Sequence, residues 1–226
     1  WLGFFNKAAN CDKLVLLDTV QYEKNYFQNR NRIISSKSQS FIWLTMPVNK
    51  GSLSDTILQK TVKFDKRVKR KYLEKIKQTY SSYPFYREHI HNIEKIIFES
   101  GTTSLSIINT SLIKYIINFL QLRCEIISAS ELEVGTEFSG TELLCNICKK
   151  TEATTYLSGI YGKKYLSEKL FIDNKINVEY QTFVHPEYKQ PSQTFVSHLS
   201  VLDLIFSFNS QECCDIIRSG YTLKES

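Results

Sequence analysis

Polar and aromatic side chains that could bind a ligand crowd one short segment near the N-terminus. Gln21 and Tyr22 open this segment, and Asn29, Arg30 and Asn31 close it. A guanidinium between two amides suits a phosphate or a carboxylate, because it can donate two parallel hydrogen bonds to either group. The alternative is an arginine paired with an internal carboxylate, with the asparagines in a turn. Of the two, we favour a substrate-binding role for all five residues.

Three further side chains could move protons. Asp18 ends an apolar run and could be a general base, a ribose-hydroxyl acceptor, a metal ligand or merely the cap of the next turn. His185 and His198 belong to the residue type that titrates near neutral pH. His198 also precedes a helix predicted to begin at Ser200, which it could cap. We predict catalytic roles for Asp18 and His185 and a substrate-binding role for His198.

Two more segments supply candidates for substrate binding. They are Ser158, Gly159, Gly162 and Tyr165 in the first segment and Tyr188 and Gln190 in the second. The glycines allow backbone amides to approach a ligand just before a predicted helix, whose N-terminus favours anions. The alternative is an ordinary Ser–Gly turn leading into a helix, because the complete phosphate-loop motif is absent.

Short apolar runs place many of these candidates at the ends of predicted strands. The runs cover residues 13–18, 124–128, 155–157 and 178–183, and the predicted helices between them cover residues 140–150 and 164–174. Strands that alternate with such helices predict a parallel sheet, and ligands bind beyond the carboxyl ends of its strands. The groups that follow successive strands are Asp18, Ser128 with Ser130, Ser158, and His185. We expect them to meet at one edge of the sheet.

The remaining segments predict a hairpin and a helical region. Residues 32–36 and 41–48 form the two arms of the hairpin. Helices are expected over residues 66–80, 88–99, 104–122 and 200–208, with His89 and His91 at the surface. The chain shows no repeat and no linker. We therefore predict a single α/β domain over residues 1–226, with a Rossmann-like parallel sheet, a helical insertion over about residues 60–122 and a small β-hairpin.

Composition and cysteine usage limit the class of protein. Of the 226 residues, 42% are hydrophobic and 13% aromatic, and no apolar stretch reaches the roughly 18 residues of a membrane helix. The six cysteines lack the spacing of a secreted disulfide framework. Cys145 and Cys148 share the buried stripe of a predicted helix, so packing is favoured over metal binding. We expect a soluble protein in a reducing cytoplasm, with no membrane partner and no metal site, and we assign no cofactor.

Positive charge is concentrated in one stretch of the chain. The formal net charge is +6, and Lys60–Lys77 contains nine lysines or arginines against two acidic residues. Such a stretch could meet the phosphates of a nucleotide or an RNA. A basic helix face is more often simply solvated, and no recognisable nucleic-acid module accompanies this one. Nucleic-acid binding through Lys60–Lys77 is therefore the lesser hypothesis.

An ordered set of motifs resembles one bacterial family, the WbqC-like proteins. The motifs are WLGFFNK (residues 1–7), LDTVQY (17–22), QNRNRI (28–33), LTMPV (44–48), YLSG with the following glycine and tyrosine (156–165), HPEYKQ (185–190) and LSVLDLIF (199–206). Members usually carry a Gln-Pro-x-Tyr-x-Pro segment before the first motif, so the resemblance implies a first strand truncated before Trp1. Thr19 stands where members often have a second acidic residue, which argues against a two-carboxylate site.

The resemblance implies a bacterial protein associated with surface-polysaccharide or glycan synthesis, where amino sugars are made and modified. Our leading hypothesis is transfer of an acyl or aminoacyl group to the amine of a nucleotide-linked amino sugar. The small-molecule partner would be a nucleotide sugar or an activated acyl donor. One alternative is a non-catalytic partner that binds a sugar nucleotide or a glycan. The other is an RNA-associated protein that draws on aminoacyl-tRNA.

Overall fold

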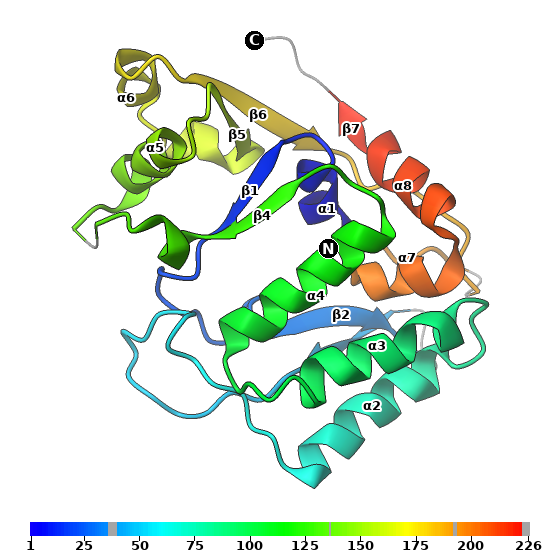
Figure 1. Cartoon of the computed structure of the whole chain (residues 1–226). Helices are drawn as coiled ribbons and strands as arrows, with labels where there is room; N and C mark the ends of the chain where they lie inside the picture. Colours follow the sequence, from blue (N-terminus) through cyan, green and yellow to red (C-terminus); the bar gives the residue numbers. More distant parts are fainter. Residues whose placement is uncertain (36–39, 136, 192–193, 223–226) are drawn as a thin grey trace.

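The computed structural model describes residues 1–35, 40–135, 137–191 and 194–222. Over these residues the chain forms two two-stranded sheets and one three-stranded sheet, surrounded by helices. Figure 1 places β5, β6, α5 and α6 at one end of the molecule and α2, α3 and the hairpin strand β2 at the other. β1, β4 and α1 lie between the two ends.

The elements follow one another in this order. The first third holds α1 (Leu2–Ala8), β1 (Lys13–Leu16), β2 (Arg30–Ile34) and β3 (Phe41–Thr45). The middle holds the helices α2 (Lys66–Tyr80), α3 (Tyr86–Phe98) and α4 (Leu105–Phe119). Next come β4 (Glu125–Ser128), the 3₁₀ helix η1 (Ala129–Leu132), α5 (Gly140–Lys150), β5 (Thr155–Gly159), the 3₁₀ helix η2 (Ile160–Lys164), α6 (Glu168–Asp173) and β6 (Asn177–Phe183). The described chain ends with α7 (Val201–Ser207), α8 (Ser210–Ser219) and β7 (Tyr221–Thr222).

The strands pair locally. β1 runs parallel to β4, β5 runs parallel to β6, and β6 also pairs antiparallel with β7. Among the described residues, no ladder joins the β1–β4 pair to the β5–β6 pair. The chain is thus a mixed helix and strand protein with small parallel and antiparallel sheets, and the Rossmann-like sheet expected from the sequence is not confirmed.

The hairpin is confirmed as an antiparallel pair of β2 and β3. β2 begins at Arg30, two residues earlier than expected, so this arginine belongs to the ladder and not to the preceding turn. β3 ends at Thr45, before Pro47, which cannot donate a ladder hydrogen bond. Ser36, the predicted end of the first arm, lies outside the described residues.

The three middle helices are confirmed. Asp65 and Ser104 precede α2 and α4, and the side chain of each accepts a hydrogen bond from an amide of the first turn. The surface position expected for His89 is wrong, because α3 packs against α4 and buries this side chain. Its ring nitrogen Nδ1 lies 2.7 Å from the hydroxyl oxygen of Tyr115.

Two C-terminal helices differ from expectation. The helix predicted over residues 164–174 is shorter, because only α6 (Glu168–Asp173) lies within it and the 3₁₀ helix η2 ends at Lys164. Gly162 lies in the tight turn of η2, where an added side chain would collide with the hydroxyl group of Ser158. α8 was not predicted, although Asn209 and Glu212 form a reciprocal capping box at its start.

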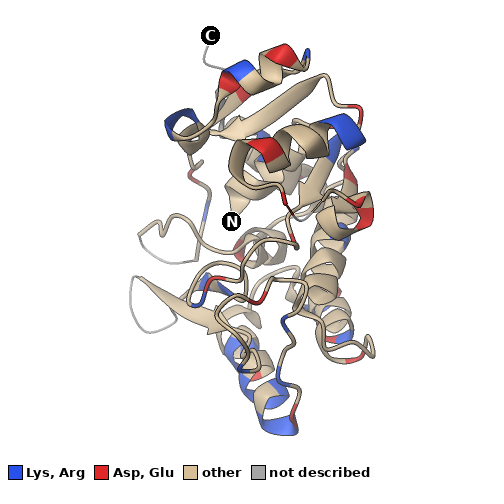
Figure 2. Cartoon of the chain, turned by 90° about the vertical axis from the view of Figure 1, so that its left-hand side faces the viewer, with Lys and Arg blue, Asp and Glu red and all other residues tan. Residues whose placement is uncertain are grey.

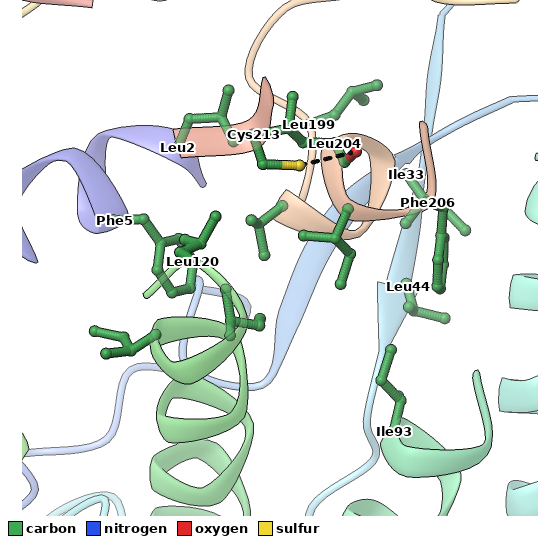
Figure 3. Close-up of a cluster of buried hydrophobic side chains, with 14 of the residues drawn as sticks. Leu2, Phe5, Ile33, Leu44, Ile93, Leu120, Leu199, Leu204, Phe206 and Cys213 are labelled. Atoms are coloured by element: carbon green, nitrogen blue, oxygen red, sulfur yellow. Dashed lines mark hydrogen bonds between the residues drawn. The ribbon is translucent and has the colours of Figure 1, made fainter. Parts of the chain in front are cut away.

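The larger hydrophobic core joins the hairpin to the helices that surround it. Figure 3 shows its centre, where side chains from α1, β2, β3, α3, α4, α7 and α8 meet. The residues labelled there are Leu2, Phe5, Ile33, Leu44, Ile93, Leu120, Leu199, Leu204, Phe206 and Cys213. A smaller core contains Cys145, Cys148, Phe171 and Ile176, which confirms packing as the environment of the two cysteines.

A buried polar chain ties α1 to β6 and α8. The side-chain amide of Gln181 donates to the carbonyl oxygen of Gly3 at 3.0 Å and to Oδ1 of Asn6 at 2.6 Å. Asn6 in turn donates to the carbonyl oxygen of Ile217 at 2.8 Å. These bonds satisfy polar groups that burial would otherwise leave costly. No described helix is both long and apolar enough to span a bilayer.

Candidate functional site

One face of the hairpin alternates guanidinium groups with aromatic rings. Arg30 and Arg32 are two residues apart on β2 and therefore project from the same face, where Trp43 of β3 lies opposite Arg32. The Arg30 guanidinium carbon lies 4.0 Å from the centroid of the Trp43 ring, and that of Arg32 lies 4.4 Å from the Phe41 ring. Phe27 contacts Trp43 from the side, with ring centroids 5.7 Å apart. We call these five residues the arginine–aromatic face.

Neither arginine of this face has an acidic partner in the described part of the chain. The salt bridges there involve other residues, and the Nε atoms of Arg30 and Arg32 are both buried without a hydrogen-bond acceptor. Stacking on an aromatic ring stabilises a cation but leaves its N–H donors unsatisfied. A buried donor without a partner costs about 1–3 kcal/mol. Two such donors on one face indicate a site for a ligand that supplies acceptors.

Two histidines lie beside this face. The centroids of the His185 and His198 rings are 4.9 Å apart. His198 is followed closely by Ser200, whose amide donates to the carbonyl oxygen of Arg32 at 2.7 Å. Burial lowers the pKa of His198, and the positive charge of Arg32 lowers it further. The two histidines and Arg32 therefore lie close together, and the charge of Arg32 disfavours protonation of His198.

His185 is held in the tautomer that leaves Nε2 free to accept a proton. Its Nδ1 lies 2.9 Å from the carbonyl oxygen of Pro186, which can only accept a hydrogen bond, so Nδ1 carries the proton. Nε2 then has a free lone pair, and it is buried without a partner among the described residues. Burial lowers the pKa of His185, the Pro186 carbonyl raises it, and the charge of His198 lowers it again. A neutral imidazole with a free Nε2 can act as a general base.

Tyr22 lies close enough to Arg30 for the charge of the arginine to affect its hydroxyl group. Burial raises the pKa of the Tyr22 hydroxyl, and the nearby charge of Arg30 opposes that rise. The Nζ atom of Lys60 lies 5.4 Å from the centroid of the Tyr22 ring and 2.8 Å from a carboxylate oxygen of Asp55. Lys60 thus has an internal counter-charge, unlike Arg30.

The three predicted amides of this region differ in their free hydrogen-bonding capacity. Asn29 donates to the carbonyl oxygen of Met46 at 2.8 Å, and its Oδ1 is buried without a partner. Oδ1 of Asn31 accepts from the backbone amide of Arg32 at 2.8 Å. Gln21 is exposed and donates to a backbone carbonyl oxygen at 2.7 Å. Asn29 therefore keeps one open acceptor.

Asp18 is buried, and both of its carboxylate oxygens are engaged. Oδ1 accepts from the Ser130 amide at 3.0 Å, while Oδ2 accepts from the hydroxyl groups of Ser130 at 2.8 Å and Ser106 at 3.1 Å. The ends of the first two predicted strands do meet here, through an internal tie among β1, η1 and α4. These contacts support a structural role, and the catalytic role of Asp18 stays a prediction.

Tyr188 and Gln190 converge on the buried carboxylate of Asp203. Its Oδ2 accepts from the Tyr188 hydroxyl at 3.0 Å and from the Gln190 side-chain amide at 3.1 Å. Gln190 also exchanges two hydrogen bonds with the backbone of Val196, at 2.8 and 3.0 Å. The polar atoms of both residues are thus used within the chain, where they fix the segment that carries His185 and His198. Their substrate-binding roles stay predictions.

The residues from Ser158 to Tyr165 belong to the other parallel sheet. Ser158 is buried, and its hydroxyl donates to the carbonyl oxygen of Gly159 at 3.1 Å. Gly162 packs against Ser158, while Tyr165 is exposed. In the part of the chain that the structure describes, no hydrogen bond or ring contact joins these four residues to the histidines or to the arginine–aromatic face. Their grouping with His185 at one sheet edge stays a prediction.

Sequence reasoning missed three members of the site. Arg32, Phe41 and Trp43 were not candidates, although the alternation of arginines on β2 and of aromatic residues on β3 was visible in the sequence. Asp203 was also missed as a structural residue. The sequence feature that could have indicated its buried role is that it is the single acidic residue within the apolar helix α7.

Other features of the described surface do not add to this site. A depression of about 370 Å³ lies between η1 and α5, and another of about 420 Å³ lies beside Cys11 and Arg218. Among the described residues, no three His, Cys, Asp or Glu side chains gather in a way that could hold a metal ion.

The features above define a mixed α/β protein with a candidate site of arginines, histidines and aromatic rings. The model of the WbqC-like protein family matches residues 1–214, so the chain belongs to the WbqC-like family. It is also 29% identical over 213 residues to uncharacterized protein Rv1507c of Mycobacterium tuberculosis (strain ATCC 25618 / H37Rv), covering 93% of this chain and 90% of that protein. No solved structure gives a significant match.

The hydrogen bonds of Asp18 predict that removing its carboxylate lowers stability. Asp18→Ala would leave the Ser130 amide and two hydroxyl groups without their acceptor, so we expect the free energy of unfolding to fall by about 3 kcal/mol. Urea denaturation measures this change. Asp12→Ala, at an exposed position, is the control and should stay within about 0.5 kcal/mol of the wild type. A variant at Asp18 as stable as the control would contradict the structural role.

Asp203 predicts a pH-dependent stability. Burial raises the pKa of this carboxyl from 3.8 to about 6, so the folded protein holds the proton more tightly than the unfolded chain does. The stabilisation that this tighter proton binding gives the folded state is full below about pH 4 and is lost as pH rises through about 6. Asp203→Asn keeps an acceptor for Tyr188 and Gln190 without the charge. Between pH 4 and 7, the free energy of unfolding of the wild type should therefore fall by up to roughly 3 kcal/mol relative to that of this variant, as measured by urea denaturation. A difference between the two proteins that does not depend on pH would contradict the expectation.

Proposed function

We propose that the arginine–aromatic face and the two histidines form the active site of a transferase that places an acyl or aminoacyl group on the amine of a nucleotide-linked amino sugar. The observation that carries this proposal is the pair of buried guanidinium Nε donors without acceptors, close to a buried imidazole with a free Nε2. The setting in bacterial surface-glycan synthesis rests on membership of the WbqC-like family. A Rossmann-like relationship, a single-domain organisation and a cytoplasmic location are further parts of the proposal.

The arginines would bind the phosphate groups of the nucleotide. A guanidinium pairs with two phosphate oxygens at once, and the buried Nε donors of Arg30 and Arg32 would gain the acceptors that they lack. Trp43 holds both cations in place. Tyr26 and Phe27 are about half exposed, at 53% and 47%, and offer stacking surfaces for a base or a sugar ring.

His185 would then take the proton that the attacking amine releases. The amine nitrogen bonds to the carbonyl carbon of the donor, and Nε2 of His185 accepts the proton lost from that nitrogen. The imidazolium returns this proton to the leaving group as the bond to the donor breaks. Because burial lowers the pKa of His185, the base is neutral and ready at neutral pH.

A second candidate function, RNA association, follows from the position of α2. Figure 2 shows Lys and Arg gathered on this helix, at one end of the molecule. Lys75 of α2 donates to the carbonyl oxygen of Trp43 at 3.3 Å, so the basic helix borders the arginine–aromatic face. A polyanion such as aminoacyl-tRNA could reach the site along it. Binding of tRNA that weakens steeply with salt would favour this function, while saturable binding of a nucleotide sugar without turnover would favour a non-catalytic binding protein.

The phosphate role of the arginines predicts a loss of binding. Arg30→Gln and Arg32→Gln should each weaken the binding of a nucleoside diphosphate sugar by about ten-fold or more, because each removes a charge-assisted pair of hydrogen bonds. Isothermal titration of UDP-glucosamine and related sugar nucleotides measures the change. Arg70→Gln is the matched control, since Arg70 is exposed on α2 and pairs only weakly with Glu74 at 3.7 Å. If Arg30→Gln and Arg32→Gln bound the sugar nucleotide as tightly as Arg70→Gln, the phosphate-binding role would be refuted.

The base role of His185 predicts a separate loss of turnover. His185→Asn keeps a donor for the Pro186 carbonyl oxygen but removes Nε2, so product formation should fall about 100-fold or more while binding changes little. In the wild type, activity should decline as pH falls through a value below 6.5, because protonation removes the base. His91→Asn, at an exposed position of α3, is the control. Unchanged turnover in His185→Asn would exclude His185 as the base.

A further inference from the structure

Two cysteines outside the proposed site face each other across the start of a parallel strand pair. The sulfur atoms of Cys11 and Cys124 are 3.6 Å apart, although 113 positions separate the residues in the chain. Cys11 lies two residues before β1, and Cys124 directly precedes β4. The first ladder partners, Lys13 and Glu125, follow at once, so the sheet register holds the two thiols together.

Three of the other four cysteines of the chain have different surroundings. Cys145, Cys148 and Cys213 are buried in the hydrophobic cores. Cys11 and Cys124 are only partly buried, and Cys11 lines a surface depression of about 420 Å³. A small oxidant can therefore reach this pair. Because no third metal ligand accompanies it among the described residues, the pair is better suited to redox chemistry than to a metal ion.

The pair is also electronically unequal. The hydrogen bond between the thiols lowers the pKa of Cys124 and raises that of Cys11, so Cys124 ionises before Cys11. Cys124 has the greater thiolate character, and the thiolate is the form that attacks peroxides. Cys11 keeps its proton and lies in position to react next.

We propose that Cys11 and Cys124 form a reversible oxidation site that reacts with peroxides. The sulfur of Cys124 attacks a peroxide oxygen, the O–O bond breaks, and a sulfenic acid forms with release of water. The sulfur of Cys11 then attacks that of Cys124, the S–O bond breaks, and a disulfide forms with a second water. Two electrons pass from the thiols to the peroxide, and a dithiol reductant reverses the change. The new bond would join the starts of β1 and β4.

Peptide mapping of the full chain tests this site directly. The reduced protein is treated with hydrogen peroxide, its free thiols are alkylated, and it is cleaved after lysine, arginine and glutamate, which separates Cys124 from Cys145 and Cys148. We expect the peptides of Cys11 and Cys124 to be joined, with a loss of about 2 Da that dithiothreitol reverses. The proposal would be overturned if Cys11 and Cys124 were both still alkylated after the peroxide had oxidised other residues. A disulfide between two chains would also overturn it.

Variants separate the roles of the two thiols. In Cys11→Ser, oxidation should stop at a sulfenic acid on Cys124, which dimedone traps, while Cys124→Ser should give neither product. Cys214→Ser is the matched control, because Cys214 is also partly buried and should not affect the disulfide. Phenylarsine oxide bridges two close thiols and needs no oxidation. The wild type should bind it through Cys11 and Cys124, and failure to do so would show that the thiols are not adjacent.

Discussion

The hydrogen bond from the Ser200 amide to the Arg32 carbonyl oxygen, at 2.7 Å, joins the hairpin to the start of α7. The candidate site depends on this junction, because it brings Arg32 next to His198 although the two are far apart in the chain. Asp203 lies within the first turn of the same helix and accepts from Tyr188 and Gln190. α7 therefore holds both the hairpin and the histidine segment. The carboxylate of Asp203 is buried and its pKa is raised, so its ionisation at neutral pH lowers the stability of the fold. The same carboxylate fixes the segment that carries His185 and His198.

Several polar groups of the candidate site lack hydrogen-bond partners within the described chain. Both carboxylate oxygens of buried Asp18, and both side-chain polar atoms of buried Asn6, have internal hydrogen-bond partners. Around the hairpin, by contrast, Arg30 and Arg32 lack acceptors in the described chain, and Nε2 of His185 lacks a donor. His198 adds a left-handed backbone conformation, with φ of 60°. Unpaired polar atoms also occur elsewhere in the described chain, at Tyr80, His89, Thr182 and Asp203, so it is the grouping of two arginines, Asn29 and His185 that marks this region as a candidate site.

Much of the helical part of the fold was predictable, because apolar periodicity and side-chain caps act locally. The starts expected at residues 66 and 104 agree with those of α2 and α4 to within one residue, and the side chains of Asp65 and Ser104 cap these helices. Sheet topology was less accessible, since the pairing of β1 with β4 and of β5 with β6 depends on long-range contacts. In the candidate site, Arg30, Tyr22 and the two histidines were identified as residue types suited to chemistry. Arg32 and Trp43 required the register of the hairpin, and the internal use of Gln190 required knowledge of Asp203 as its partner.

The central claim is that the unpaired arginines bind the phosphates of a ligand in one site with the histidine pair beside them. Side-chain ¹⁵N NMR during a titration with inorganic pyrophosphate measures this most directly, because it reports the arginine Nε–H groups and the imidazole nitrogens separately. Saturable shifts of Arg30, Arg32, His185 and His198 with one common dissociation constant are the predicted result. Shifts confined to the lysines and arginines of α2, or two independent dissociation constants for the arginines and the histidines, would contradict it.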